Sequence, residues 1–123
     1  MNIHYIGEGG ESVPLLTGCN QTGCHTSPAI TAASLEAVQE GIEQNLDTLF
    51  TLLGNRGWVD TVSTSSGYGG ILLTGGRLVI RPAVKAGALY NYFLVEHDMS
   101  KGVHNTNYAT ELLRSSIEAL RTP

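Results

Sequence analysis

The strongest constraint on the fold is a series of apolar residues at helical spacing between residues 35 and 53. They recur at steps of three and four, which places them on one face of a helix. These residues are Leu35, Val38, Ile42, Leu46, Leu49, Phe50 and Leu53. Ser34 is a candidate N-cap, and Gly54 ends the pattern. The sequence therefore predicts a helix that begins at residue 29 or 34 and ends at residue 53.

Two more helices are predicted in the second half of the chain. Pro82 has the fixed backbone angle that suits the first position of a helix, and this helix is expected to run to about Glu96. A third helix begins after Asn105 or Thr106, because apolar and small residues then return at helical spacing. They are Tyr108, Leu112, Leu113, Ser116 and Leu120.

The β content is expected to be small. Two short apolar segments, 71–73 and 78–80, flank Gly75-Gly76 and predict a β-hairpin. Residues 3–6 alternate in polarity and predict an edge strand before a Gly-rich turn at 7–10. A chain of 123 residues is long enough for one modest core. We therefore predict one mainly α domain over residues 1–123, with about three helices and a minor β-hairpin, in which residues 1–18 form an extended lead-in from a preceding domain.

The charge pattern argues against several classes of function. The net charge is −4, and the seven lysines and arginines are scattered along the sequence, so a nucleic-acid partner is not expected. No apolar run approaches the roughly 20 residues of a membrane span. The nearest candidate for a catalytic triad is Asp98, Ser100 and His104, which lacks the strained turn and oxyanion donors of a serine nucleophile. We therefore expect no enzyme activity.

Residues 19–25 carry the strongest chemical signal. The only two cysteines, Cys19 and Cys24, are separated by four residues, and His25 follows the second cysteine directly. This order is typical of covalent attachment of a c-type haem, in which two thiols add to the vinyl groups of the porphyrin and the adjacent imidazole becomes the proximal iron ligand. The usual signature has two residues between the cysteines, so the loop is longer here. We predict one covalent haem c on Cys19, Cys24 and His25.

Two other interpretations of the cysteines stay open. They suit a small disulfide loop that staples a non-haem interaction domain, or half of a zinc site completed by two of the four histidines. A disulfide gives no reason for the position of His25. Zinc sites usually take a second tight pair of ligands, whereas His97 and His104 lie seven residues apart. The composition also favours haem, since two Phe, one Trp and two Met beside 15 Gly would fill a core thinly.

A six-coordinate haem needs a second axial ligand, and the candidates are His104, His97, Met99 and His4. His104 comes first because it stands where a loop turns into the third predicted helix, next to the capping residue Asn105. His97 has a competing role, since a histidine at the C-terminal end of a helix favours the helix dipole. A second imidazole gives a saturated iron of comparatively low potential, whereas a methionine ligand raises it. The available partners for the propionates are Arg56, Arg77, Arg81, Lys85 and Lys101.

Several segments resemble the C-terminal part of multihaem c-type cytochromes, which include the ammonia-forming nitrite reductases and related extracellular electron carriers. The resembling segments are Ala88-Leu89-Tyr90-Asn91-Tyr92, the run 98–108 with Gly102-Val103-His104-Asn105 inside it, and Leu112-Leu113. In that family the histidine of the similar segment is a distal haem ligand, so the resemblance implies this role for His104. It covers roughly residues 84–120 and the cysteine motif. This chain carries one haem motif, whereas the family members carry several.

Together these features predict one-electron transfer by a covalent haem with His25 and His104 as iron ligands. A vacant or displaceable sixth position would instead make the chain a haem-based sensor or gas-binding domain. The expected partner is a redox protein or a neighbouring haem domain, and self-association would bring the haems of several copies together. Covalent haem attachment takes place outside the cytoplasm, and the start of the sequence lacks a signal peptide. We therefore expect a mature periplasmic or extracellular protein, or an excised domain of one.

Overall fold

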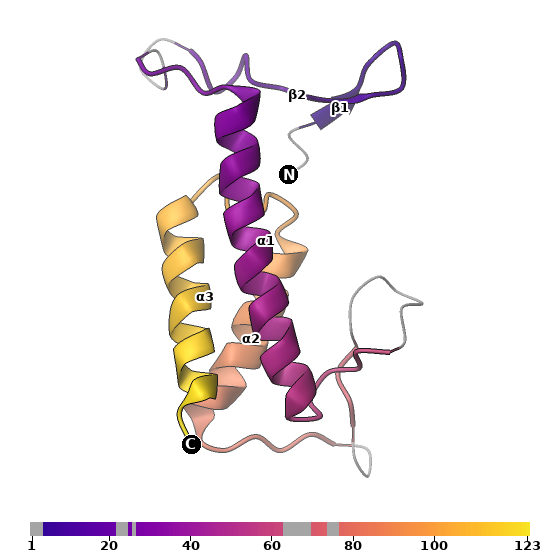
Figure 1. Ribbon diagram of the computed structural model, residues 1–123, viewed down its shortest axis with the longest axis vertical. Coiled ribbons are helices and arrows are strands. Elements are labelled where there is room, and N and C mark those ends of the chain that lie inside the picture. Colours follow the sequence, from indigo (N-terminus) through magenta and orange to yellow (C-terminus); the bar gives the residue numbers. More distant parts are fainter. Residues whose placement is uncertain (1–3, 22–24, 26, 63–69, 74–76) are drawn as a thin grey trace.

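The structure is a computed structural model that describes residues 4–21, 25, 27–62, 70–73 and 77–123. Its three helices are α1 (Ala32–Asn55), α2 (Ala83–His97) and α3 (Thr106–Arg121). Figure 1 shows α1 and α3 running in the same direction and α2 running against them. Helix α3 packs along both of the others, whereas α1 and α2 contact each other less. The prediction of a mainly α domain with three helices is confirmed.

Helix α1 begins with a capping box. Thr31 is the N-cap residue, since the Ser34 N–H donates to Thr31 Oγ1 at 3.1 Å and the Thr31 N–H donates to Ser34 Oγ at 2.9 Å. Ser34, the predicted N-cap, is therefore the reciprocal partner three residues inside the cap. The helix also continues past its predicted end at residue 53 and stops at Asn55.

Replacing Thr31 with alanine is expected to lower the free energy of unfolding by about 1 kcal/mol, because the Ser34 N–H loses its acceptor. Urea unfolding followed by circular dichroism measures this loss. Thr51→Ala is the control: its hydroxyl donates to the Asp47 carbonyl within α1, and alanine is the better helix former there. Equal losses in both variants would contradict the role of the cap.

Helices α2 and α3 start close to their predicted positions. The sequence predicted Pro82 as the first residue of the second helix. In the structure it is the N-cap residue, and α2 begins one residue later, at Ala83. Asn105 caps α3, and its side chain accepts a hydrogen bond from the Tyr108 N–H at 3.4 Å. Within the described part of the chain, no helix has the length and apolar character needed to cross a membrane.

The main core lies between the three helices and is built from their side chains together with Val59 from the connection after α1. Phe50 stacks on Tyr92 with ring centroids 5.6 Å apart. The fully enclosed cluster comprises Ile42, Leu49, Leu53, Val59, Ala88, Leu89, Tyr92, Val95, Ala109, Leu113, Ile117 and Leu120. Side chains of the chain itself therefore fill this cluster.

The small β-sheet joins β1 (His4–Ile6) and β2 (Ser12–Pro14), which pair antiparallel with Tyr5 opposite Val13. The edge strand predicted near the start of the chain is thus present. The hairpin predicted around Gly75-Gly76 differs from the structure. Its turn lies outside the described residues, and the flanking residues form no strand, because Ile71 pairs in an isolated bridge with the buried Val59.

Candidate functional site

The predicted attachment motif lies in the loop between β2 and α1. The Cys19 N–H donates to the Leu16 carbonyl at 3.0 Å, and the Cys19 carbonyl accepts from the His25 N–H at 3.1 Å. The backbone therefore folds back, so that the first cysteine and the histidine are neighbours. Cys19 is half-buried and His25 is exposed. Cys24 lies outside the described residues, so the structure tests neither the pair of thioether bonds nor the alternative disulfide.

Asn20, which the sequence analysis did not single out, closes this loop. Its amide nitrogen donates to the Ile30 carbonyl at 2.8 Å, and its amide oxygen accepts from the Ile30 N–H at 2.7 Å. Both backbone polar groups of Ile30 are therefore satisfied by one side chain, which ties the start of the loop to the last residues before α1. An asparagine between two cysteines has no recognisable pattern, so no sequence signal pointed to it.

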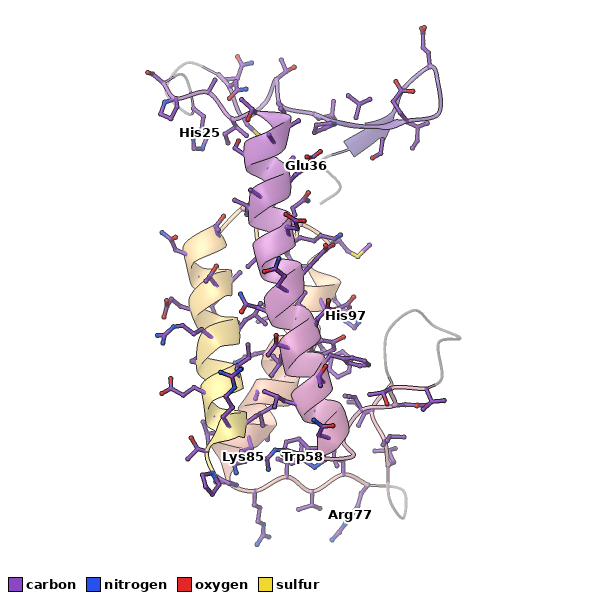
Figure 2. All side chains as sticks on the ribbon, in the orientation of Figure 1. His25, Glu36, Trp58, Arg77, Lys85 and His97 are labelled. Atoms are coloured by element: carbon purple, nitrogen blue, oxygen red, sulfur yellow. The ribbon has the colours of Figure 1, made fainter. Side chains whose placement is uncertain are left out.

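His25 lines an open pocket of about 400 Å³ beside the N-terminal half of α1. The walls are mainly apolar and include Ile30, Leu35, Val38 and Val103. They come from three parts of the chain, namely the motif loop, the first turns of α1 and the loop before α3. Figure 2 shows His25 at this end of the molecule. A pocket of this size and polarity is typical of a site for an apolar group held by a few polar atoms.

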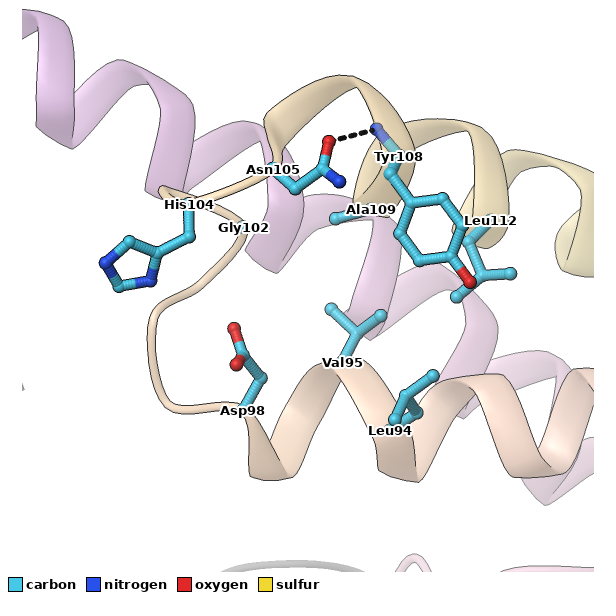
Figure 3. A pocket seen from close by; sticks show the side chains of 9 residues that line it. All are labelled: Leu94, Val95, Asp98, Gly102, His104, Asn105, Tyr108, Ala109 and Leu112. Carbon is cyan, nitrogen blue, oxygen red and sulfur yellow. Dashed lines mark hydrogen bonds between the residues drawn. The ribbon is translucent and has the colours of Figure 1, made fainter. Parts of the chain in front are cut away.

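His104 lies at the rim of a second pocket, of about 230 Å³, between α2 and α3. Leu94, Val95, Tyr108 and Leu112 form its apolar floor. Figure 3 shows the imidazole of His104 pointing away from Leu94 and Tyr108. The side chain of His104 is exposed, and Tyr108, one of the residues whose spacing predicted the third helix, is 57% exposed.

The two predicted iron ligands are placed in neighbouring segments but in different pockets. Val103 and Thr106, on the two sides of His104, line the pocket of His25, whereas His104 itself lines the pocket between α2 and α3. The structure thus brings the loop of His104 to the wall of the His25 pocket. It does not bring the two imidazoles into one pocket.

The loop that carries His104 has an unusual backbone. Three of its residues have positive φ angles, Met99 at 60°, Lys101 at 51° and Gly102 at 75°. Side chains hold this shape, because the buried Ser100 hydroxyl donates to Asp98 and the Lys101 ammonium pairs with Glu43 on α1. Backbone conformations of this kind persist only where the surroundings enforce them, and they are concentrated at functional sites.

The other candidate ligands lie elsewhere. His97 ends α2, with its Nε2 3.5 Å from Glu96 Oε2 and its side chain 62% exposed. This position agrees with the predicted role at the C-terminal end of the helix dipole. Burial raises the pKa of the neighbouring Glu96 carboxyl, and the charge of His97 partly opposes this shift. Met99 is exposed beside Glu43 and Lys101, and His4 belongs to strand β1.

The predicted propionate partners are mostly far from the motif. Lys85 lies at the start of α2, where its Nζ donates to the Thr122 carbonyl at 3.0 Å. Figure 2 shows Lys85 and Arg77 at the end of the molecule opposite His25. Of the five predicted cations, only Lys101 lies in the half that carries the motif, and it is paired with Glu43.

Among the described residues, no group of three or more His, Cys, Asp and Glu side chains is arranged to hold a metal ion. His25 lies at the pocket whose mainly apolar walls include Ile30, Leu35, Val38 and Val103. Searches of protein-family models, of curated proteins and of solved structures find no match to this chain.

Proposed function

We propose that the chain is a one-electron transfer module that carries one covalent haem c. The observation that carries this proposal is the position of His25, held by a closed loop beside Cys19 and over the apolar wall of Ile30, Leu35, Val38 and Val103. In a c-type site the cysteines fix the porphyrin edge and the histidine binds the iron, and burial of the ring is one of the means by which a protein tunes the potential. The resemblance to multihaem cytochromes supports the same assignment.

The chain's own residues have distinct roles in this proposal. Cys19 and Cys24 would attach the porphyrin, and His25 would bind its iron. The apolar wall of the pocket would limit the access of water to the group, which influences the potential together with the iron ligands. His104 is the proposed second ligand, supplied by a loop whose neighbouring residues already line the pocket. When bound, the haem supplies reversible one-electron chemistry at its iron. The proposed partner is a redox protein or an adjacent haem domain, in the periplasm or outside the cell.

Absorption spectroscopy of protein matured with haem-attachment machinery tests this function. We expect a low-spin spectrum in both redox states that carbon monoxide does not change. His104→Ala is expected to open a position for carbon monoxide, because Val103 and Thr106 on its two sides line the pocket of His25. The control His97→Ala is expected to leave the spectrum unchanged, because His97 ends α2 beside Glu96 and neither of its neighbours in the sequence lines that pocket.

Three outcomes separate the alternatives. Carbon monoxide binding by the unaltered protein would favour the haem-based sensor. Absence of a Soret band, with thiols that resist alkylation, would leave the disulfide-stapled interaction domain. An unchanged low-spin spectrum in His104→Ala would keep the haem but remove His104 as its ligand.

A further inference from the structure

Basic side chains that are scattered along the sequence gather in one half of the folded molecule. Five of the seven lie where α1 and α3 end and α2 begins, or in the connection between α1 and α2, and only two of the eleven acidic residues, Asp60 and Glu118, lie there. The five are Arg56, Arg77, Arg81, Lys85 and Arg121, whereas Arg114 lies in the middle of α3. We call this half the basic end. Figure 2 shows Arg77 and Lys85 there, far from Glu36.

The rest of the molecule is acidic. It holds nine carboxylates and two basic residues, Lys101 and Arg114. Four of these follow one face of α1 at steps of four, three and four residues and form what we call the acidic stripe: Glu36, Glu40, Glu43 and Asp47. Like charges four residues apart destabilise a helix, so the stripe opposes the stability of α1.

Contacts within the chain account for only part of this charge. Lys85 is buried and bonded to the Thr122 carbonyl, and Arg114 pairs with Glu111 at 2.7 Å. By contrast, Arg77 and Arg81 are exposed and have no ion pair with any residue that the structure describes. The same holds on the acidic stripe for Glu36 and Glu40.

Apolar side chains accompany the unpaired arginines. Val79 and Val84, which lie near Arg77 and Arg81 in the sequence, are 56% and 60% exposed. Exposed apolar residues beside arginine are typical of protein–protein interfaces, where arginine is enriched and its planar guanidinium binds carboxylates in pairs of hydrogen bonds. The basic end therefore has the composition of a docking surface for a protein rich in carboxylates.

We propose that this protein is a second copy of the chain, which docks its acidic stripe against the basic end of the first. The two surfaces have opposite charge and lie in opposite halves of one molecule, so a head-to-tail contact satisfies both. Complementary fields of this kind steer association and set the orientation of the partners. A head-to-tail contact leaves one free surface of each kind, so it can extend to further copies. This proposal does not depend on the haem.

Sedimentation velocity of the full chain tests the proposal. We expect assemblies larger than one chain at about 10 mM ionic strength, where the Debye length is about 30 Å, and single chains at about 1 M, where it is about 3 Å. Arg77→Glu with Arg81→Glu removes one surface, and Glu36→Lys with Glu40→Lys removes the other. Each double variant alone is expected to associate at least about tenfold more weakly, because like charges then meet in the contact.

A mixture of the two double variants gives the decisive result. In the mixture the two intact surfaces are complementary and so are the two reversed surfaces, so we expect association to return to about the wild-type level although neither variant assembles alone. The control is Glu8→Lys with Glu11→Lys, which makes the same change in net charge away from the stripe and should assemble further. A wild-type chain that stays monomeric at low ionic strength would overturn the proposal. Dimers that persist in either double variant alone would also overturn it. So would a wild-type chain that binds an added polyanion but not a second copy of itself.

Discussion

Leu113→Ala is expected to lower the free energy of unfolding by about 2 to 5 kcal/mol. Leu113 is completely buried on α3, the helix that packs against both α1 and α2. Truncation removes packing contacts within the buried cluster and leaves a cavity there. A domain of this size is stabilised by only about 5 to 15 kcal/mol in total, so the loss is a large fraction.

Urea unfolding followed by helical circular dichroism measures this effect. Leu94→Ala is the matched control, because Leu94 lies on α2 with 43% of its surface exposed and should lose far less. Equal losses in the two variants would mean that α3 is not the centre of the core.

Gly102→Ala is expected to cost about 2 to 4 kcal/mol, from an unfavourable backbone angle and from overpacking. Gly102 has a φ of 75°, which residues with a side chain rarely adopt. A Cβ atom there would lie 2.8 Å from Ile42 Cγ1 and 3.3 Å from Ala109 Cβ. The loop would have to move away from α1, and His104 would move with it.

The control for this substitution is Gly87→Ala in α2, where a Cβ atom meets no other atom within 4 Å. Alanine is the better helix former, so this variant is expected to gain about 0.5 to 1 kcal/mol. A lower free energy of unfolding in Gly102→Ala and a higher one in Gly87→Ala would show that the position of the glycine, and not its replacement as such, decides the effect. A neutral Gly102→Ala would contradict the close packing of this loop.

The helices could be predicted from the sequence because their signals are local. Apolar spacing marked α1 and α3, and Pro82 and Asn105 marked two of the starts. The sequence predicted Ser34 as the N-cap of α1, whereas the structure has Thr31 there. The two residues form one capping box, in which the residue at the Ser34 position is usually Glu or Gln, so the pattern favoured Ser34 as the cap itself.

The β-hairpin near residue 75 was wrong for a different reason. Strand pairing is non-local, and the pairing of Ile71 with Val59 depends on the burial of Val59 against the helices. A Gly-Gly turn signal contains no information about such a partner. The hairpin that the fold does contain uses the Gly-rich turn at 7–10, where Gly10 has a φ of 82°.

The candidate site was predictable in its parts but not in its arrangement. Cys19, His25 and His104 could be singled out from the sequence, whereas Asn20 could not, since its bonds to Ile30 depend on how the loop folds. The placement of His25 and His104 in separate pockets also depends on tertiary contacts. Arginines that looked scattered are gathered because antiparallel packing of α2 brings distant segments to one end.

The closed loop at the start of α1 has a consequence for how a cofactor could be retained. Of the first ten residues of α1 only Leu35 is buried, and it lies outside the main core cluster. Figure 1 shows this part of α1 extending beyond α2 and α3. Segments with few buried contacts open locally while the rest of a protein stays folded. A cofactor held there by packing alone would dissociate at each opening, whereas thioether bonds would keep it on the chain until the loop closed again.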